Sequence, residues 1–146
     1  MNKRLLFCAL LGSLTACQQD NDVQPNSSSL AAEVAGKYQT NFFLDPSCVA
    51  VPADKMPFAE LRTESDSTVT LVYTRLYPNK DIRQIPNVVL SRQTEAIQLR
   101  VADSSIGTLQ ADRIFTDSGM EKQGKLLRIS VQSNNPQNTL YFSGYK

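Results

Sequence analysis

The sequence predicts an all-β domain over residues 30–146, built as an eight-stranded antiparallel up-and-down barrel. Short runs in which apolar and polar residues alternate predict strands with one buried face. Short connections rich in Asp, Ser, Asn and Gly separate most of these runs, and short connections force neighbouring strands to be antiparallel. Because a meander of eight strands has exposed edges unless it closes, the pattern favours a barrel. A β-sandwich of two sheets is the alternative.

The expected elements begin with a helical turn from Ser29 to Ala35, which Ser29 can cap and Gly36 can end. A first strand follows, because every second residue from Tyr38 to Leu44 is aromatic, aliphatic or threonine. Asp45–Pro57 contains three prolines, so we expect a long loop there. The other seven strands are expected at residues 58–63, 68–77, 87–91, 96–101, 106–115, 125–132 and 138–145.

The composition excludes several classes of function. The chain contains no histidine, which excludes Ser-His-Asp and Cys-His catalysis and any histidine-ligated metal. The formal charge is +1 and no basic stripe is present, which argues against nucleic acid as a partner. We therefore expect a protein that is not an enzyme and that holds no cofactor or metal.

The N-terminal residues carry a targeting pattern. Lys3 and Arg4 precede an apolar run that is too short to span a bilayer, and Leu14-Thr15-Ala16-Cys17 follows. This arrangement resembles the signal peptide and lipobox of bacterial lipoproteins. The resemblance implies that residues 1–16 are removed and that the thiol of Cys17 receives lipid. Residues 17–29 would then form the lipidated end and a flexible tether, because they are polar and contain few apolar residues.

The residues after Cys17 bear on the membrane to which the protein is sorted. In some bacteria an Asp directly after the lipidated cysteine retains a lipoprotein in the inner membrane, and this chain has Gln18 there. Asp20 and Asp22 resemble the acidic export signal of surface lipoproteins, although they could equally serve to solvate the tether. We expect a cell-envelope protein anchored by lipid in the outer membrane, on its periplasmic face or at the cell surface.

The domain itself resembles the lipocalin-like domains of bacterial lipoproteins. The matching features are Gly36-Lys37-Tyr38 after a short helical turn, a long first loop, and Leu140-Tyr141-Phe142-Ser143-Gly144 in the last strand. The resemblance implies a barrel that holds a small apolar or amphipathic ligand. Lipocalins have Trp at the position of Tyr38 and an Arg late in the barrel over that ring, where the last strand here offers Lys146.

The barrel topology places the candidate ligand-binding residues. In an up-and-down barrel, the loop Asp45–Pro57 lies at the same mouth as the end of the third strand and the turns near residues 78–81, 103–105 and 133–138. We predict that a binding site at this mouth is lined by Phe42, Leu44, Tyr73, Arg75 and Tyr77. Arg75 would meet an anionic group of the ligand, or else pair with a nearby Asp or Glu.

Two alternatives stay open at this point. Cys48 is either a small buried residue or a thiol that reacts or pairs with another chain. A packed barrel with an exposed aromatic patch would favour a different function, that of a protein-binding accessory or inhibitor module of the cell envelope.

Overall fold

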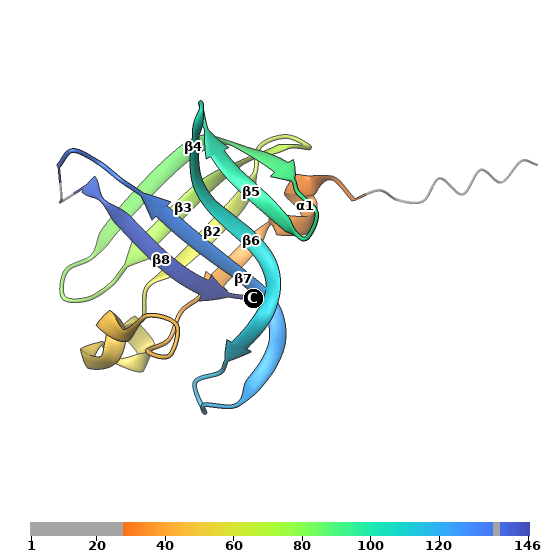
Figure 1. Ribbon diagram of the computed structural model, residues 1–146. Helices are drawn as coiled ribbons and strands as arrows, with labels where there is room; N and C mark the ends of the chain where they lie inside the picture. Colours follow the sequence, from red (N-terminus) through yellow and green to blue (C-terminus); the bar gives the residue numbers. More distant parts are fainter. Residues whose placement is uncertain (1–27, 136–137) are drawn as a thin grey trace, which may run out of the picture.

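The computed structural model describes residues 28–135 and 138–146. Eight strands each pair with the next one in the chain, and the last pairs with the first, so the sheet closes into an antiparallel up-and-down barrel (Figure 1). The predicted barrel is confirmed, and the sandwich alternative is wrong. The predicted signal peptide, Cys17 and most of the predicted tether lie outside the described residues.

The helical and strand elements have the following bounds. One short helix, α1, spans Leu30–Val34, and two 3₁₀ turns span Pro46–Ala50 and Ala53–Lys55. The strands are β1 (Gly36–Gln39), β2 (Phe58–Thr63), β3 (Thr68–Arg75), β4 (Asp81–Arg92), β5 (Ala96–Val101), β6 (Ser104–Phe115), β7 (Glu121–Val131) and β8 (Leu140–Tyr145).

The core lies inside the barrel and receives side chains from α1 and from all eight strands. The alternation in the sequence decides which residues these are. In β5, Ile97 and Leu99 are buried while Gln98 between them is only half-buried; in β7, Leu127 and Ile129 are buried while Arg128 is exposed. Each such side chain contributes about 1.5–3 kcal/mol through removal from water.

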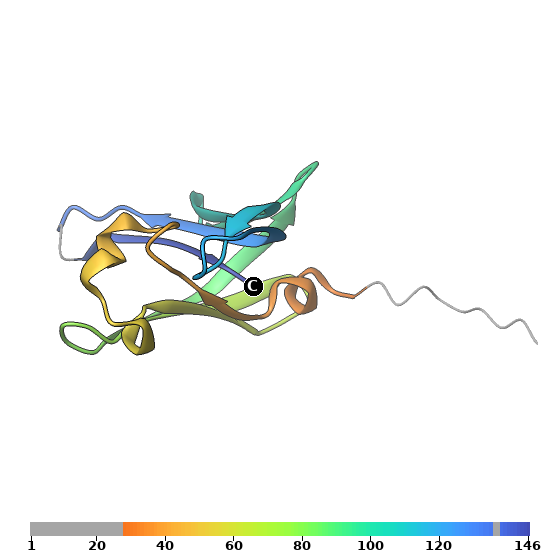
Figure 2. The same ribbon diagram turned by 90° about the horizontal axis from the view of Figure 1, so that it is seen from below.

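The helix α1 closes one end of the barrel. Ser29 caps it as predicted, since its Oγ accepts a hydrogen bond from the Ala32 amide at 3.2 Å. Ala31 and Val34 are fully buried in the core, and the Ala31 amide donates to the Asp66 carbonyl in the turn between β2 and β3. Figure 2 shows this end and the opposite end, where the segment between β1 and β2 lies.

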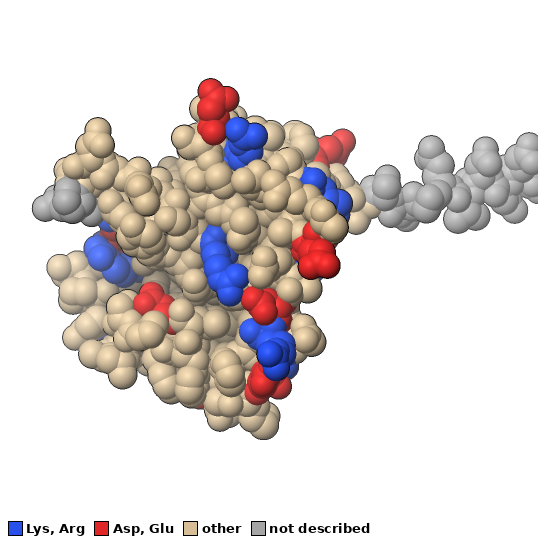
Figure 3. Space-filling model, in the orientation of Figure 1, with Lys and Arg blue, Asp and Glu red and all other residues tan. Residues whose placement is uncertain are grey.

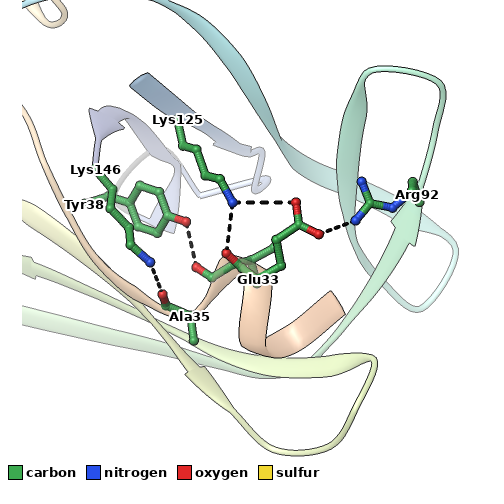
Figure 4. A network of polar contacts seen from close by, with 7 residues as sticks. Glu33, Ala35, Tyr38, Arg92, Lys125 and Lys146 are labelled. Atoms are coloured by element: carbon green, nitrogen blue, oxygen red, sulfur yellow. Dashed lines mark hydrogen bonds and ion pairs between the residues drawn. The ribbon is translucent and has the colours of Figure 1, made fainter. Parts of the chain in front are cut away.

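Three side chains donate hydrogen bonds to the backbone carbonyls at the C-terminal end of α1 (Figure 4). Lys125 donates to the Glu33 carbonyl at 3.2 Å, Tyr38 donates to the Val34 carbonyl at 2.6 Å, and Lys146 donates to the Ala35 carbonyl. Carbonyls at a helix C-terminus have no partner within the helix and favour cations, so this arrangement ties α1 to β1, β7 and the last residue of the chain.

The same region brings together two residues that the sequence separates widely. The Lys146 ammonium lies 6.0 Å from the centroid of the Tyr38 ring. The Glu33 carboxylate completes the network by pairing with Lys125 at 3.6 Å and with Arg92.

Several strand boundaries differ from the expected ones. The first strand ends at Gln39 and not at Leu44, because Asn41 folds the chain into a turn: its Oδ1 accepts from the amides of Phe43 and Leu44 at 3.1 Å each. The third strand ends at Arg75, two residues before Tyr77.

The fourth and seventh strands are longer than expected. The fourth strand begins at Asp81, six residues before the predicted start at Asn87. Pro86 lacks the amide that a regular ladder needs, and an irregularity in the pairing of β3 with β4 accommodates it, with Asn87 at φ 55°. The seventh strand begins at Glu121, because the hairpin with β6 continues to the pair Phe115 and Glu121.

Candidate functional site

The segment of residues 40–57 covers the end of the barrel that lies opposite α1, since α1 precedes β1 and this segment follows it (Figures 1 and 2). Asn41 fastens the segment to the β6–β7 hairpin, because its Nδ2 donates to the Phe115 carbonyl at 2.7 Å. Asp45 caps the first 3₁₀ turn by accepting from the Ser47 amide at 3.0 Å. The segment is therefore ordered by its own polar side chains.

Cys48 lies within this segment and is 4% exposed. Burial, together with the negative charge of Asp45, raises the pKa of the thiol above its ordinary value. A raised pKa keeps the thiol protonated and poorly nucleophilic. The interpretation of Cys48 as a small buried residue therefore accounts for its position.

A pocket of about 750 Å³ lies beside this segment, which is within the usual range for small-molecule sites. Leu44 and Asp45 contribute to it from the segment, and β6, β7 and β8 contribute the rest. We call it the larger pocket, and its lining residues are Leu44, Asp45, Ser104–Thr108, Arg128–Gln132 and Tyr141–Ser143.

The lining of the larger pocket is amphipathic. Ile106, Ile129 and Phe142 are at most 5% exposed and belong to the barrel core, so the pocket reaches the core side chains. Asp45 lines the same pocket and is half-buried, so a charged group stands beside this apolar wall. Arg128 and Tyr141, which alternate with buried Ile129 and Phe142, point to the outer face of the sheet. A ligand there could bury an apolar part and keep a polar part near water.

A second pocket of about 320 Å³ lies between the same segment and strands β1 and β2. We call it the smaller pocket, and it shares no lining residue with the larger one. Its lining residues are Lys37, Gln39–Phe42, Ala53, Asp54, Met56–Phe58, Leu76 and Asp117. The segment 40–57 therefore contributes to two separate pockets.

An exposed aromatic cluster adjoins the smaller pocket. The rings of Phe42 and Phe43 lie 3.9 Å apart, and those of Phe43 and Phe115 lie 5.9 Å apart. All three are more than two-fifths exposed, at 42%, 43% and 43%. We call Phe42, Phe43 and Phe115 the aromatic patch.

The charges on the outer face of β5 to β8 are mixed. Figure 3 shows groups of both signs and no continuous patch of one sign on this face. Arg113 pairs with Glu121 at 2.9 Å and Arg128 pairs with Asp112 at 3.1 Å, so much of the positive charge there is neutralised locally. This face lacks the basic stripe that nucleic-acid binding uses.

The predicted ligand-binding residues are not gathered in one pocket. Leu44 lines the larger pocket and Phe42 lines the smaller one. Tyr73 is buried in the core at 9% exposure, where its ring meets that of Phe142 edge-on at 5.8 Å. Tyr73 thus contacts the larger pocket only through Phe142, which lines it.

The other two predicted residues lie in neither pocket. Arg75 pairs with Asp81 at 3.5 Å, which is the carboxylate pairing that the sequence left open as an alternative. Tyr77 is 41% exposed and follows the end of β3. The sequence predicts that the turns at 103–105 and 133–138 lie at this mouth, but it does not predict that residues of β6, β7 and β8 line the larger pocket. The alternation of apolar and polar residues gives no signal for this, because it does not say which strands lie next to a pocket.

Comparison with protein-family models, with curated proteins and with solved structures finds no match to this chain. In residues 28–135 and 138–146, no group of three or more Cys, Asp or Glu side chains could hold a metal ion. The part of the chain that the structure describes also contains no helix long and apolar enough to cross a membrane. The function proposed below therefore rests on the residues that line the two pockets.

Proposed function

We propose that this chain is a lipid-anchored protein of the cell envelope whose barrel binds a small amphipathic ligand in the larger pocket. The composition of that pocket carries the proposal. Its apolar wall of Ile106, Ile129 and Phe142 would bury the hydrocarbon part of a ligand. Asp45, which is half-buried, supplies a negative charge near the polar part. Small-molecule sites typically combine an apolar lining with a few polar groups in this way.

The anchor follows from the resemblance of Leu14–Cys17 to a lipobox. The tether would join the barrel at α1, and the segment 40–57 lies at the opposite end. The larger pocket would therefore lie at the end of the barrel farther from the point where the tether joins it, and we expect the anchoring membrane to be the outer membrane. We expect binding without catalysis, since the chain has no histidine to act as a base.

The aromatic patch favours a second candidate function. Phe42, Phe43 and Phe115 are exposed together, and aromatic residues are enriched in the centres of protein interfaces. A protein-binding accessory or inhibitor module would use this patch and would not need the larger pocket.

The ligand proposal is tested by native mass spectrometry of the protein purified from its own host. Wild-type protein should carry a small-molecule mass, and Leu44→Lys should lose it, because a lysine there places a charge in the pocket. Val49→Lys is the matched control, since Val49 belongs to the same segment, is 78% exposed and lines neither pocket. A ligand that both variants retain equally would contradict the proposal. A co-purified protein that is lost on Phe43→Ser would support the second candidate instead.

The anchor is tested separately. Cys17→Ser should abolish acyl labelling and release the protein from the membrane fraction. Undiminished membrane retention of this variant would contradict the lipoprotein assignment and would leave the ligand proposal untouched.

A further inference from the structure

The smaller pocket has an apolar interior with one buried hydroxyl. Phe42, Met56 and Phe58 line it, and Thr40 lines it at only 4% exposure. The single hydrogen bond of the Thr40 hydroxyl within the described chain runs to the neighbouring Asn41 carbonyl at 3.5 Å. This is beyond the usual length of a hydroxyl hydrogen bond, so the buried hydroxyl is poorly satisfied and could bind a polar group better.

Three charged side chains line this pocket, and none of them forms an ion pair with another residue of the described parts of the chain. Lys37 lies with its ammonium 3.7 Å from the centroid of the Phe58 ring, and it forms no ion pair within residues 28–135 and 138–146. Asp54 and Asp117 line the same pocket and likewise form no ion pair in the described parts of the chain. One positive and two negative groups, all three exposed to solvent, thus stand at the edge of an apolar interior.

We propose that the smaller pocket binds an α-amino acid with an apolar side chain. The ligand carboxylate would meet Lys37, its ammonium would meet Asp54 or Asp117, and its side chain would lie between Phe42, Met56 and Phe58. All three charged groups are exposed at the edge of the pocket and are solvated, so a ligand without charge would gain nothing from them, whereas a zwitterion could pair with both signs. A ligand with only carboxylates would be repelled by the two aspartates. The site is separate from the larger pocket and does not depend on the function proposed for it.

The volume agrees with a ligand of this size. About 320 Å³ lies at the lower end of the range for small-molecule sites, which suits a single amino acid. Phenylalanine is the natural probe, because the pocket offers the Phe58 ring for stacking and the Met56 thioether for a sulfur–aromatic contact.

Methionine methyl groups provide the measurement. The chain has three methionines, of which Met56 lines the pocket and Met120 is 68% exposed on the turn between β6 and β7. In the full chain carrying ¹³C-methyl methionine, titration with L-phenylalanine should shift the Met56 resonance and leave that of Met120 unchanged. Phenethylamine lacks the carboxylate and hydrocinnamate lacks the ammonium, so each should bind roughly tenfold more weakly.

One variant and its control test the role of Lys37. Lys37→Gln should weaken phenylalanine about tenfold and leave phenethylamine unchanged, because only phenylalanine has a carboxylate to lose. Lys80→Gln is the matched control: Lys80 is exposed in the turn between β3 and β4 and lines neither pocket, so phenylalanine should bind as before.

Three outcomes would overturn the proposal. The first is a Met56 resonance that stays in place up to about 10 mM phenylalanine, a concentration that corresponds to very weak binding. The second is hydrocinnamate that binds as tightly as phenylalanine. The third is a Lys37→Gln variant that weakens phenylalanine and phenethylamine equally. The analogue series on the wild-type chain decides the question even if a variant fails to fold.

Discussion

The two ends of the barrel differ in what their polar groups do. At the α1 end, Lys125, Tyr38 and Lys146 donate to three successive carbonyls and tie α1 to the barrel. At the other end, the segment 40–57 lines two pockets and leaves the rings of Phe42 and Phe43 exposed. At the α1 end the hydrogen bonds hold the helix against the barrel. At the other end, pocket-lining side chains and exposed rings remain available to a ligand. We expect stability to depend on the first end and binding on the second.

The largest expected effect tests this difference with one aromatic residue from each end. Tyr38→Ala should lower the free energy of unfolding by about 4 kcal/mol, because it leaves a cavity in the core and removes the hydrogen bond to Val34. Phe43→Ala should lower it by only about 1 kcal/mol, since that ring is 43% exposed and its ring partners Phe42 and Phe115 are exposed too. Denaturant unfolding measures both. Equal losses would mean that stability is spread evenly over the two ends.

A second prediction concerns the residue that orders the pocket end. Asn41→Ala should cost about 2 kcal/mol, because it removes the side-chain partner of the Phe43 amide and of the Phe115 carbonyl, while the Leu44 amide keeps its bond to the carbonyl of residue 41. It should also weaken binding in both pockets, since the segment between them loses its fixed position. Asn79→Ala, an exposed asparagine in the turn between β3 and β4, should change neither property. Intact ligand binding in Asn41→Ala would show that other contacts hold the segment.

A third and smaller effect concerns pH at the α1 end. Burial, and secondarily the negative charge of Glu33, raises the pKa of Tyr38 from 10.0 to about 12. Below pH 10 the phenol is protonated in both states, so its contribution to stability is complete. Between pH 10 and 12 the unfolded chain loses this proton while the folded chain keeps it, so stability falls as the pH rises.

Tyr38→Phe isolates that contribution. The variant should lose about 1 kcal/mol at neutral pH with the hydrogen bond to Val34. Its stability should then fall less steeply than that of the wild type between pH 10 and 12. The free energy of unfolding of the variant should still fall somewhat over this pH range, because burial also raises the pKa of Tyr73 and Tyr145. Identical slopes in urea titrations of the two proteins would show that Tyr38 does not cause the loss.

Local pattern was sufficient to predict the fold class. Alternation in segments such as Ile97–Val101 decides which face is buried, and short turns decide that neighbours are antiparallel, so both follow from residues close together in the sequence. The same reasoning extended the first strand to Leu44, because the alternation continues through Phe42. The strand ends at Gln39 because both the side chain and the carbonyl of Asn41 accept hydrogen bonds from the amides that follow it.

The pockets were decided by the tertiary structure. The predicted mouth was placed from topology, yet the lining of the larger pocket comes from Ile106, Ile129 and Phe142, whose proximity depends on the register of β6, β7 and β8. Asn41 meets the Phe115 carbonyl across 74 residues, and Lys146 meets the Ala35 carbonyl across 111. A local pattern specifies burial and direction, but it contains no information on which distant groups come within hydrogen-bond distance. Those contacts exist only once the barrel has closed.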